Sequence, residues 1–158
     1  MNMENNIKND IQKQNIHKIL AHSHATQLVL FLFAVFLDFV FDINLFTDSA
    51  PVGVGVVILV LGSVLIFWAQ HTSRHFNKEN INKESFSKGP YHFVRNPTNL
   101  GIFSMIVGFG IIANSFFVIF FALLSSLIVK FVFLEKEEKI LILKYGEPYL
   151  EYIKSVKL

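Results

Sequence analysis

Lysine and arginine are confined to short blocks of this 158-residue chain, and the stretches between the blocks are long and apolar. No lysine or arginine occurs from Ala25 to His71, and no charged residue of either sign occurs from Asn96 to Val129. Because a helix needs about 20 apolar residues to cross a bilayer, these stretches predict membrane-spanning helices. They constrain the fold more than any single motif does.

The composition also favours a membrane protein. Hydrophobic residues make up 53% of the chain and charged residues only 16%, against about 25% charged residues in ordinary soluble domains. The 18 phenylalanines are too many for a soluble core of this size, because a small domain buries only about two-thirds of its chain surface. The absence of cysteine excludes disulfides and thiolate catalysis. A net charge of +2 gives no reason to expect a nucleic-acid partner.

We therefore predict an all-α, polytopic membrane protein with four transmembrane helices. The predicted spans cover roughly residues 25–46, 52–71, 98–113 and 115–134. The last two form a helical hairpin that turns at Asn114–Ser115, since both residue types favour turns. Residues 1–24 precede the spans, as an amphipathic helix on the lipid surface or as a polar tail, and residues 25–158 form one domain.

The basic residues predict the orientation. All 14 lysines and arginines lie before the first span, between the second and third, or at and beyond the end of the fourth. The positive-inside rule makes this side cytoplasmic. We expect a multi-pass integral membrane protein with both termini in the cytoplasm, in the inner membrane if the source is bacterial.

A first candidate functional motif, residues 89–101, joins the loop after the second span to the third span. It reads Gly89-Pro90-Tyr91-His92-Phe93-Val94-Arg95-Asn96-Pro97-Thr98-Asn99-Leu100-Gly101. Pro97 keeps Asn96 out of helical geometry, so we expect Thr98 to cap a helix that starts beside Arg95. Such a helix start and a guanidinium together suit a carboxylate or phosphate. Alternatively, Arg95 and Tyr91 only anchor the chain at the membrane interface.

A second candidate motif, residues 135–152, follows the fourth span. At helical spacing Glu138 shares a face with apolar and aromatic side chains, namely Leu134, Leu141 and Tyr145. A carboxylate on such a face is costly unless it meets a partner, such as Arg95 or a cationic ligand. Gly146 and Pro148 are expected to end this helix, after which Tyr149 and Tyr152 fold back. The alternative is a solvated helix that leaves the membrane.

Together the two motifs resemble those of the membrane methyltransferases, which include isoprenylcysteine carboxyl methyltransferase and, more distantly, the phospholipid N-methyltransferases. The shared order is Gly-Pro-Tyr-x3-Arg-x-Pro-x3-Gly, a helical hairpin, and Glu-Glu-x2-Leu-x3-Tyr-Gly-x2-Tyr-x2-Tyr, over about residues 89–152. The resemblance implies that both motifs enclose S-adenosylmethionine at the cytoplasmic end of the helices. The cofactor-binding residues it implies are Tyr91, Arg95, Asn96, Pro97, Asn99, Gly101, Glu137 and Glu138, with Arg95 and Glu138 also catalytic.

The chemistry of S-adenosylmethionine suits these residue types. Its sulfonium and ammonium groups attract carboxylates and π faces, and its carboxylate attracts a guanidinium. Two positions depart from the family pattern, because Asn96 stands where histidine is usual and Asn99 where tyrosine is usual. Asparagine forms hydrogen bonds but cannot become charged or offer a ring, so the departures bear on the acceptor and on part of the cofactor contact.

The sequence thus predicts an S-adenosylmethionine-dependent membrane methyltransferase. Its acceptor would be a lipophilic carboxylate or amine, either a small molecule or a lipid, that arrives through the surrounding membrane lipids at the cytoplasmic face. Because positioning supplies most of the catalysis of methyl transfer, no protein nucleophile is required. One alternative is an NADPH-dependent membrane reductase of the sterol-reductase type, to which the C-terminal region is loosely similar. The other is a non-catalytic relative of the family, which Asn96 and Asn99 would favour.

Two further polar features are candidate sites. Asp38 lies near the middle of the first span, where an acid is a functional candidate by default. It would line a path for the lipid substrate or pair with Ser125 or Ser126. We expect no metal site, because His71 and His75 have no third ligand at a suitable spacing.

Overall fold

The computed structural model describes residues 2–47, 51–74 and 86–156 of the chain. The described residues form helices and contain no strand, which confirms the predicted all-α class. The α-helices are α1 (Asn2–Phe41), α2 (Val52–Arg74), α4 (Pro97–Ile112), α5 (Phe116–Ile128), α6 (Glu135–Tyr145) and α7 (Glu147–Ser155). A 3₁₀ turn, η1 (Gly89–His92), precedes α4, and a π-helical segment, η2 (Val129–Leu134), joins α5 to α6.

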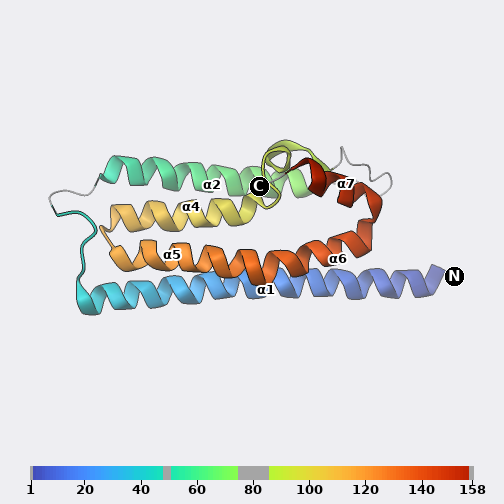
Figure 1. The fold of residues 1–158 in the computed structure, drawn as a ribbon, viewed down its shortest axis with the longest axis horizontal. Coiled ribbons are helices and arrows are strands. Elements are labelled where there is room, and N and C mark those ends of the chain that lie inside the picture. Colours follow the sequence, from blue (N-terminus) through green and yellow to red (C-terminus); the bar gives the residue numbers. More distant parts are fainter. Residues whose placement is uncertain (1, 48–50, 75–85, 157–158) are drawn as a thin grey trace.

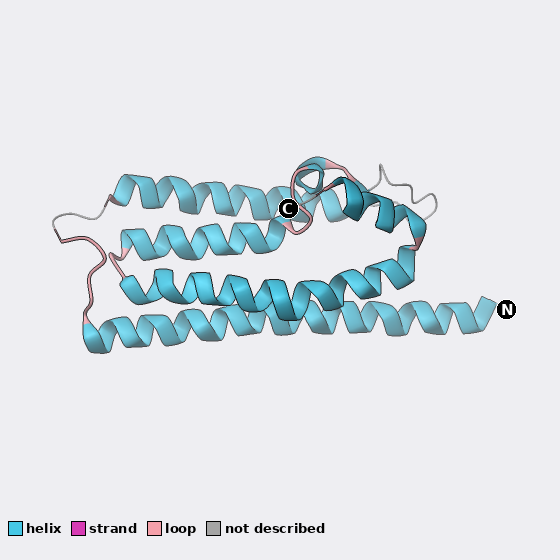
Figure 2. Cartoon of the chain, viewed as in Figure 1, coloured by secondary structure: helices cyan, strands magenta, loops and turns pink. Residues whose placement is uncertain are grey.

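The long helices lie side by side in the order α2, α4, α5, α1 (Figures 1 and 2). At one end of this bundle the chain turns from α4 into α5, and we call this the Asn114 end. At the other end η1, the start of α4, α6 and α7 come together, and we call this the Arg95 end. The first turns of α1 extend past this end along the axis of the same helix (Figure 1).

Among the described residues, three helical runs are long and apolar enough to cross a membrane: Ala21–Phe41, Val52–Arg74 and Phe116–Leu143. The third predicted span corresponds to α4, which is apolar but has only 16 residues, about 24 Å at the helical rise. The run of 28 residues from Phe116 is about 42 Å long, which exceeds the hydrocarbon thickness of about 30 Å. Its apolar part ends at Leu134, so we expect the charged turn Glu135–Lys139 to lie outside the hydrocarbon.

Glycines allow α2 and α4 to approach closely. A Cβ added at Gly62 would lie 2.7 Å from the carbonyl oxygen of Gly101, and one at Gly108 would lie 2.7 Å from that of Gly55. Close backbone approach through small residues is a usual way for helices to associate in membranes. This packing holds the start of α4, and therefore Arg95, in place beside α2.

The Asn114 end is closed by a polar clasp. Asn114 has a φ of +54°, its Oδ1 accepts a hydrogen bond from the Phe46 N–H (2.8 Å), and its Nδ2 donates to the carbonyl oxygen of Phe46 (3.0 Å). The hydroxyl of Ser115 caps α5 by accepting from the Val118 N–H at 3.1 Å. The predicted turn at Asn114–Ser115 is therefore confirmed.

The same clasp corrects the predicted end of the first span. Helix α1 ends at Phe41 and not near residue 46. Asp42 has a φ of +47°, so the chain leaves the helix there and runs across to Asn114, whose carbonyl oxygen accepts from the Leu45 N–H at 3.0 Å. These long-range hydrogen bonds replace the last helical turn that the apolar pattern predicts.

Asp38 is half-buried on α1. The predicted partner Ser125 uses its hydroxyl proton within its own helix, donating to the carbonyl oxygen of Ala122 at 2.9 Å. The Ser125 hydroxyl is therefore not the donor to the Asp38 carboxylate, whereas pairing with Ser126 and the lining of a lipid path stay predictions. His75, considered above with His71, lies outside the described residues.

Candidate functional site

Glycine and proline shape the chain that leads into the site. Gly89 has a φ of +58°, and a Cβ there would lie 2.6 Å from the Thr72 hydroxyl oxygen, so the position suits glycine both for its backbone and for its space. Pro90 starts the η1 turn, and Pro97 occupies the first position of α4, where proline is favoured. Arg95 thus lies in a short segment fixed between two proline-started elements.

Asn96, and not Thr98 as predicted, caps α4. Its Oδ1 accepts a hydrogen bond from the Asn99 N–H at 3.3 Å. The physical reason is that Pro97 already takes the first helical position, so the residue before it lies outside the helix (φ −130°, ψ 72°) and becomes the cap. The Leu100 N–H also bonds to the Asn96 carbonyl oxygen, at 3.3 Å. Two of the N–H groups that we expected to face an anion are therefore bonded within the helix.

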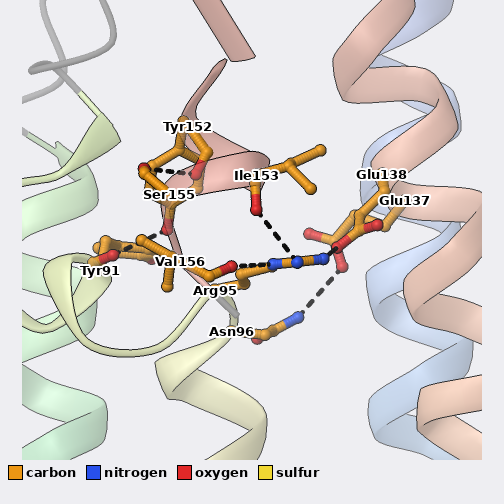
Figure 3. A network of polar contacts seen from close by, with 9 residues as sticks. All are labelled: Tyr91, Arg95, Asn96, Glu137, Glu138, Tyr152, Ile153, Ser155 and Val156. Carbon is orange, nitrogen blue, oxygen red and sulfur yellow. Dashed lines mark hydrogen bonds and ion pairs between the residues drawn. The ribbon is translucent and has the colours of Figure 1, made fainter. Parts of the chain in front are cut away.

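Arg95 links the segment before α4 to α6 and to the end of α7 (Figure 3). Its Nη1 donates to Glu138 Oε1 of α6 at 3.1 Å, its Nη2 donates to the Ile153 carbonyl oxygen at 3.1 Å, and its Nε donates to the Val156 carbonyl oxygen. The first contact is also an ion pair and confirms that Glu138 finds a partner in Arg95. The two carbonyls belong to the C-terminal end of α7, where a cation satisfies free acceptors and complements the helix dipole.

Glu137 lies beside this ion pair and is bonded by Asn96, whose Nδ2 donates to Glu137 Oε2 at 3.3 Å. Burial, and then the negative charge of Glu138, raise the pKa of Glu137 from its ordinary 4.5 to about 7, and the bond from Asn96 opposes the rise. The two neighbouring carboxylates thus differ in their surroundings. The Glu138 carboxylate forms an ion pair with Arg95, whereas the Glu137 carboxylate accepts a hydrogen bond from the neutral amide of Asn96.

Tyrosines from α6 and α7 cover the carboxylates. The Phe86 ring packs against the rings of Tyr145, Tyr149 and Tyr152, with centroids 5.1, 5.2 and 5.8 Å away. The Tyr152 hydroxyl donates to the carbonyl oxygen of Tyr91 at 2.8 Å. Helix α6 ends at Gly146, which has a φ of +63°. The predicted helix end and the folding back of Tyr149 and Tyr152 are both confirmed.

Tyr91, Tyr149 and Tyr152 keep their hydroxyl protons at physiological pH, because their pKa values are raised. Burial is the main cause that raises the pKa of Tyr152 to about 12. Burial also raises the pKa of Tyr91, opposed by hydrogen bonds with Ser73 and Thr98. Burial and then the negative charges of Glu138 and Glu137 raise the pKa of Tyr149. The cluster therefore presents aromatic faces and un-ionised hydroxyl groups beside the carboxylates.

Two cavities adjoin at the Arg95 end. The first, which we call the tyrosine cavity, has a volume of about 360 Å³ and is lined by Tyr91, Tyr145, Tyr149, Tyr152, Glu137 and Glu138, among others. The second, which we call the amide cavity, has a volume of about 430 Å³ and is lined by Gln27, Asn99, Phe103, Ser126, Phe131 and Glu135, among others. Arg95, Asn96, Leu134 and Glu138 line both cavities.

The structure brings together most of the residues chosen from the sequence. Five of them line the tyrosine cavity: Tyr91, Arg95, Asn96, Glu137 and Glu138. Asn99 lines the amide cavity instead. Pro97 is buried as the first residue of α4. Gly101 packs against Gly62 and Ile66 of α2, and it is not among the described lining residues of either cavity.

Sequence reasoning missed the contribution of α1. Ser23 and Gln27 are buried, with exposed fractions of 2% and 3%, and His24 and Gln27 line cavities. A signal was present, because Ser23 and Gln27 are four residues apart at the start of an apolar span and so share one helix face. The aromatic contacts of Phe86 were also missed, since a lone phenylalanine in a polar loop carries no pattern.

A family model described as phospholipid methyltransferase matches residues 50–148, from just before α2 to the start of α7. No curated protein and no solved structure matches the chain. The match covers more than half of the sequence, and the chain belongs to the phospholipid methyltransferase family. Together with the three membrane-length apolar helices, this defines an integral membrane protein of the methyltransferase kind. Helix α1 lies outside the matched region.

Proposed function

We propose that this protein transfers a methyl group from S-adenosylmethionine to a lipophilic acceptor at the cytoplasmic face of the membrane. The observation that carries the proposal is the tyrosine cavity, where two neighbouring carboxylates and four tyrosines converge at one end of the apolar bundle. A site of this composition suits a cation that also carries an aromatic group. Family membership supplies the kind of reaction.

The residues of the tyrosine cavity fit S-adenosylmethionine. Glu137 and Glu138 would face its positive groups, and the rings of Tyr149 and Tyr152 offer π faces to a sulfonium or an adenine. The volume of about 360 Å³ lies within the usual range of about 300–1,000 Å³ for small-molecule sites. When bound, the cofactor supplies an electrophilic methyl group on a sulfonium, and the chain supplies its position and surroundings.

Arg95 acts in this proposal as a positioning residue. Its three described hydrogen bonds go to Glu138 and to two carbonyl oxygens at the end of α7. They fix the Glu138 carboxylate and hold α7, with Tyr149 and Tyr152, over the cavity. Asn96 supports Glu137 in the same way. Both residues thus shape the cavity wall through contacts within the protein.

The acceptor would be a small lipophile or a lipid that reaches the site from the bilayer. A carboxylate or amine acceptor carries its own nucleophile, which agrees with a chain that has no cysteine. The family match gives no support to the sterol-type reductase, and it does not favour a non-catalytic relative.

The orientation has its own test, because a chain without cysteine can be labelled at a single introduced thiol. Thr47 at the Asn114 end and Glu151 on α7 are both exposed. If the Arg95 end is cytoplasmic, an impermeant maleimide added outside intact cells labels Thr47→Cys but not Glu151→Cys. The reverse pattern would contradict the proposed orientation.

The reaction is tested by supplying methyl-tritiated S-adenosylmethionine to membranes that contain the protein and extracting the lipids. We expect the label to enter a lipophilic product. The matched control is the double variant Glu137→Gln/Glu138→Gln, which keeps the side-chain shapes but removes both negative charges. Equal labelling of the lipid extract by the wild type and by the double variant would overturn the proposal.

A further inference from the structure

We propose that the amide cavity, together with an apolar groove that adjoins it, binds the methyl acceptor, and that Gln27 and Asn99 recognise a hydrogen-bond donor in the acceptor head group. This inference rests on the proposed function, since it concerns the second substrate of the same reaction. It assigns to helix α1 a role in the site, although α1 lies outside the region that matches the family.

The first observation is a pair of unsatisfied amide oxygens. Gln27 is 3% exposed, and neither its Oε1 nor the buried Oδ1 of Asn99 has a hydrogen-bond partner among the described residues. The two side chains come from α1 and α4 and line the same cavity. Leaving a buried acceptor unpaired costs about 1–3 kcal/mol. A bound molecule that donates to both oxygens would remove this penalty.

The second observation is a groove that leads to Gln27. It has a volume of about 340 Å³ and runs between α1, α2 and α4, where apolar side chains such as Phe31, Leu59 and Met105 line it. Gln27 lines both this groove and the amide cavity, and His24 lines both the groove and the tyrosine cavity. A hydrocarbon chain lying in the groove would therefore place its polar head at Gln27, beside the proposed cofactor site.

The chemistry of the cavity indicates the kind of head group. Besides the two amide oxygens, the carboxylates of Glu135 and Glu138 line it, so hydrogen-bond acceptors come from α1, α4 and α6. The guanidinium of Arg95 is engaged by Glu138 and by α7, and Lys130 is exposed at the rim. This arrangement favours an amine over a carboxylate as the methyl acceptor, because a neutral amine keeps both a lone pair and N–H donors. It also favours a head group with an N–H or O–H donor over an ester or ether head that has none.

The π-helical segment η2 adds a supporting observation. Val129, Lys130, Phe131 and Leu134 belong to η2 and line the amide cavity. π-helical turns are rare and occur frequently at functional sites. The wider turn of η2 shifts the register of the side chains that line the cavity, relative to the register of a continuous α-helix.

The test compares three single-chain lipids that differ only near the head: oleyl alcohol, oleylamine and methyl oleate. Binding to the detergent-purified full chain is measured by native mass spectrometry. We expect the alcohol and the amine to bind at least about tenfold more tightly than the donor-free ester. Gln27→Met and Asn99→Leu should each reduce this preference to less than about threefold. Thr26→Val is the control, because the Thr26 hydroxyl bonds to the His22 carbonyl oxygen of its own helix at 2.8 Å.

Thermal unfolding of the same variants separates recognition from a structural role. Gln27→Met removes an unsatisfied buried acceptor, so its unfolding temperature should equal or exceed that of the wild type while the preference is lost. Equal binding of all three lipids to the wild type would overturn the inference, as would a preference that survives both substitutions. Calorimetry with S-adenosylmethionine on the same samples distinguishes the two proposals. Failure of S-adenosylmethionine to bind would contradict the proposed function, whereas the lipid preference decides this inference.

Discussion

The two ends of the helical bundle differ in whether their polar groups have hydrogen-bond partners. At the Asn114 end, the side chain of Asn114 is satisfied by Asn44 and Phe46, and its carbonyl oxygen is satisfied by Leu45. At the Arg95 end, two cavities are lined by polar groups, and four buried side-chain atoms, on Ser23, His24, Gln27 and Asn99, have no partner among the described residues.

This contrast separates structure from function. A polar network that satisfies itself stabilises a fold and needs no ligand. Unsatisfied buried groups reduce stability, so a protein is expected to keep them where a ligand completes them. The comparison predicts that substitutions at the Asn114 end change stability alone, whereas those at the Arg95 end change ligand binding as well.

The largest effect is expected for Arg95→Ala, which acts on both properties. The substitution leaves Glu138 unpaired and frees two carbonyl oxygens of α7. We expect a loss of about 2 kcal/mol in the free energy of unfolding, less than for a fully buried pair, because the two side chains are 28% and 29% exposed. Affinity for S-adenosylmethionine should fall at least about tenfold as α7 loosens, measured by calorimetry in detergent.

Arg95→Lys is the matched control for this prediction. It keeps the positive charge beside Glu138 but cannot reproduce the forked contacts of the guanidinium, so its stability and affinity should lie between those of the wild type and Arg95→Ala. Wild-type behaviour of Arg95→Ala in both measurements would contradict the positioning role.

The next largest effect is expected for Asn114→Ala, which should change stability but not ligand binding. It removes three side-chain hydrogen bonds and places alanine at a φ of +54°. We expect a loss of about 2 kcal/mol in thermal or denaturant unfolding. Asn114→Gly removes the same bonds but tolerates the backbone, so it should lose less. A fall in S-adenosylmethionine affinity for either variant would break the contrast between the two ends.

Glu137→Gln tests the contrast through the pH dependence of stability. The raised pKa of Glu137 means that, between its ordinary 4.5 and about 7, the folded state binds more protons than the unfolded state, so stability falls as pH rises through this window. Glutamine should flatten this dependence and raise the unfolding temperature at pH 8, while it weakens the binding of cationic S-adenosylmethionine. An unchanged pH profile would show that Glu137 is not held in this environment.

The smallest effect is expected for Tyr152→Phe. It removes the hydrogen bond to the Tyr91 carbonyl oxygen but keeps the ring against Phe86. We expect a loss of about 1 kcal/mol in unfolding free energy and a change of less than about threefold in S-adenosylmethionine affinity. Tyr152→Leu removes the ring as well and should weaken binding further, if the π face contributes.

Local sequence patterns predicted the features that depend on neighbouring residues, such as turns and helix ends. The helix end at Gly146, the turn at Asn114–Ser115 and the need of Glu138 for a partner all follow from residue type and periodicity, and the structure confirms them. The predicted cap of α4, Thr98, is wrong by two residues, because Pro97 takes the first helical position and the residue before it becomes the cap. The structure places the cap at Asn96.

Features that depend on distant contacts escaped the sequence. Helix α1 ends at Phe41 because its following loop bonds to Asn114, a contact between segments far apart in the chain. Gln27 carries no motif, and its importance appears only when α1 packs beside α4 and α5. The π-helical form of η2 is equally invisible, since Val129–Leu134 reads as ordinary apolar helix.

The central claim is that the tyrosine cavity binds S-adenosylmethionine through its two carboxylates, and a calorimetric titration of the detergent-purified protein tests it most directly. The account predicts saturable binding to the wild type, retained in Asn114→Gly and lost or weakened at least about tenfold in the double variant Glu137→Gln/Glu138→Gln. No binding to a folded wild-type protein, or equal affinity in the double variant, would contradict it.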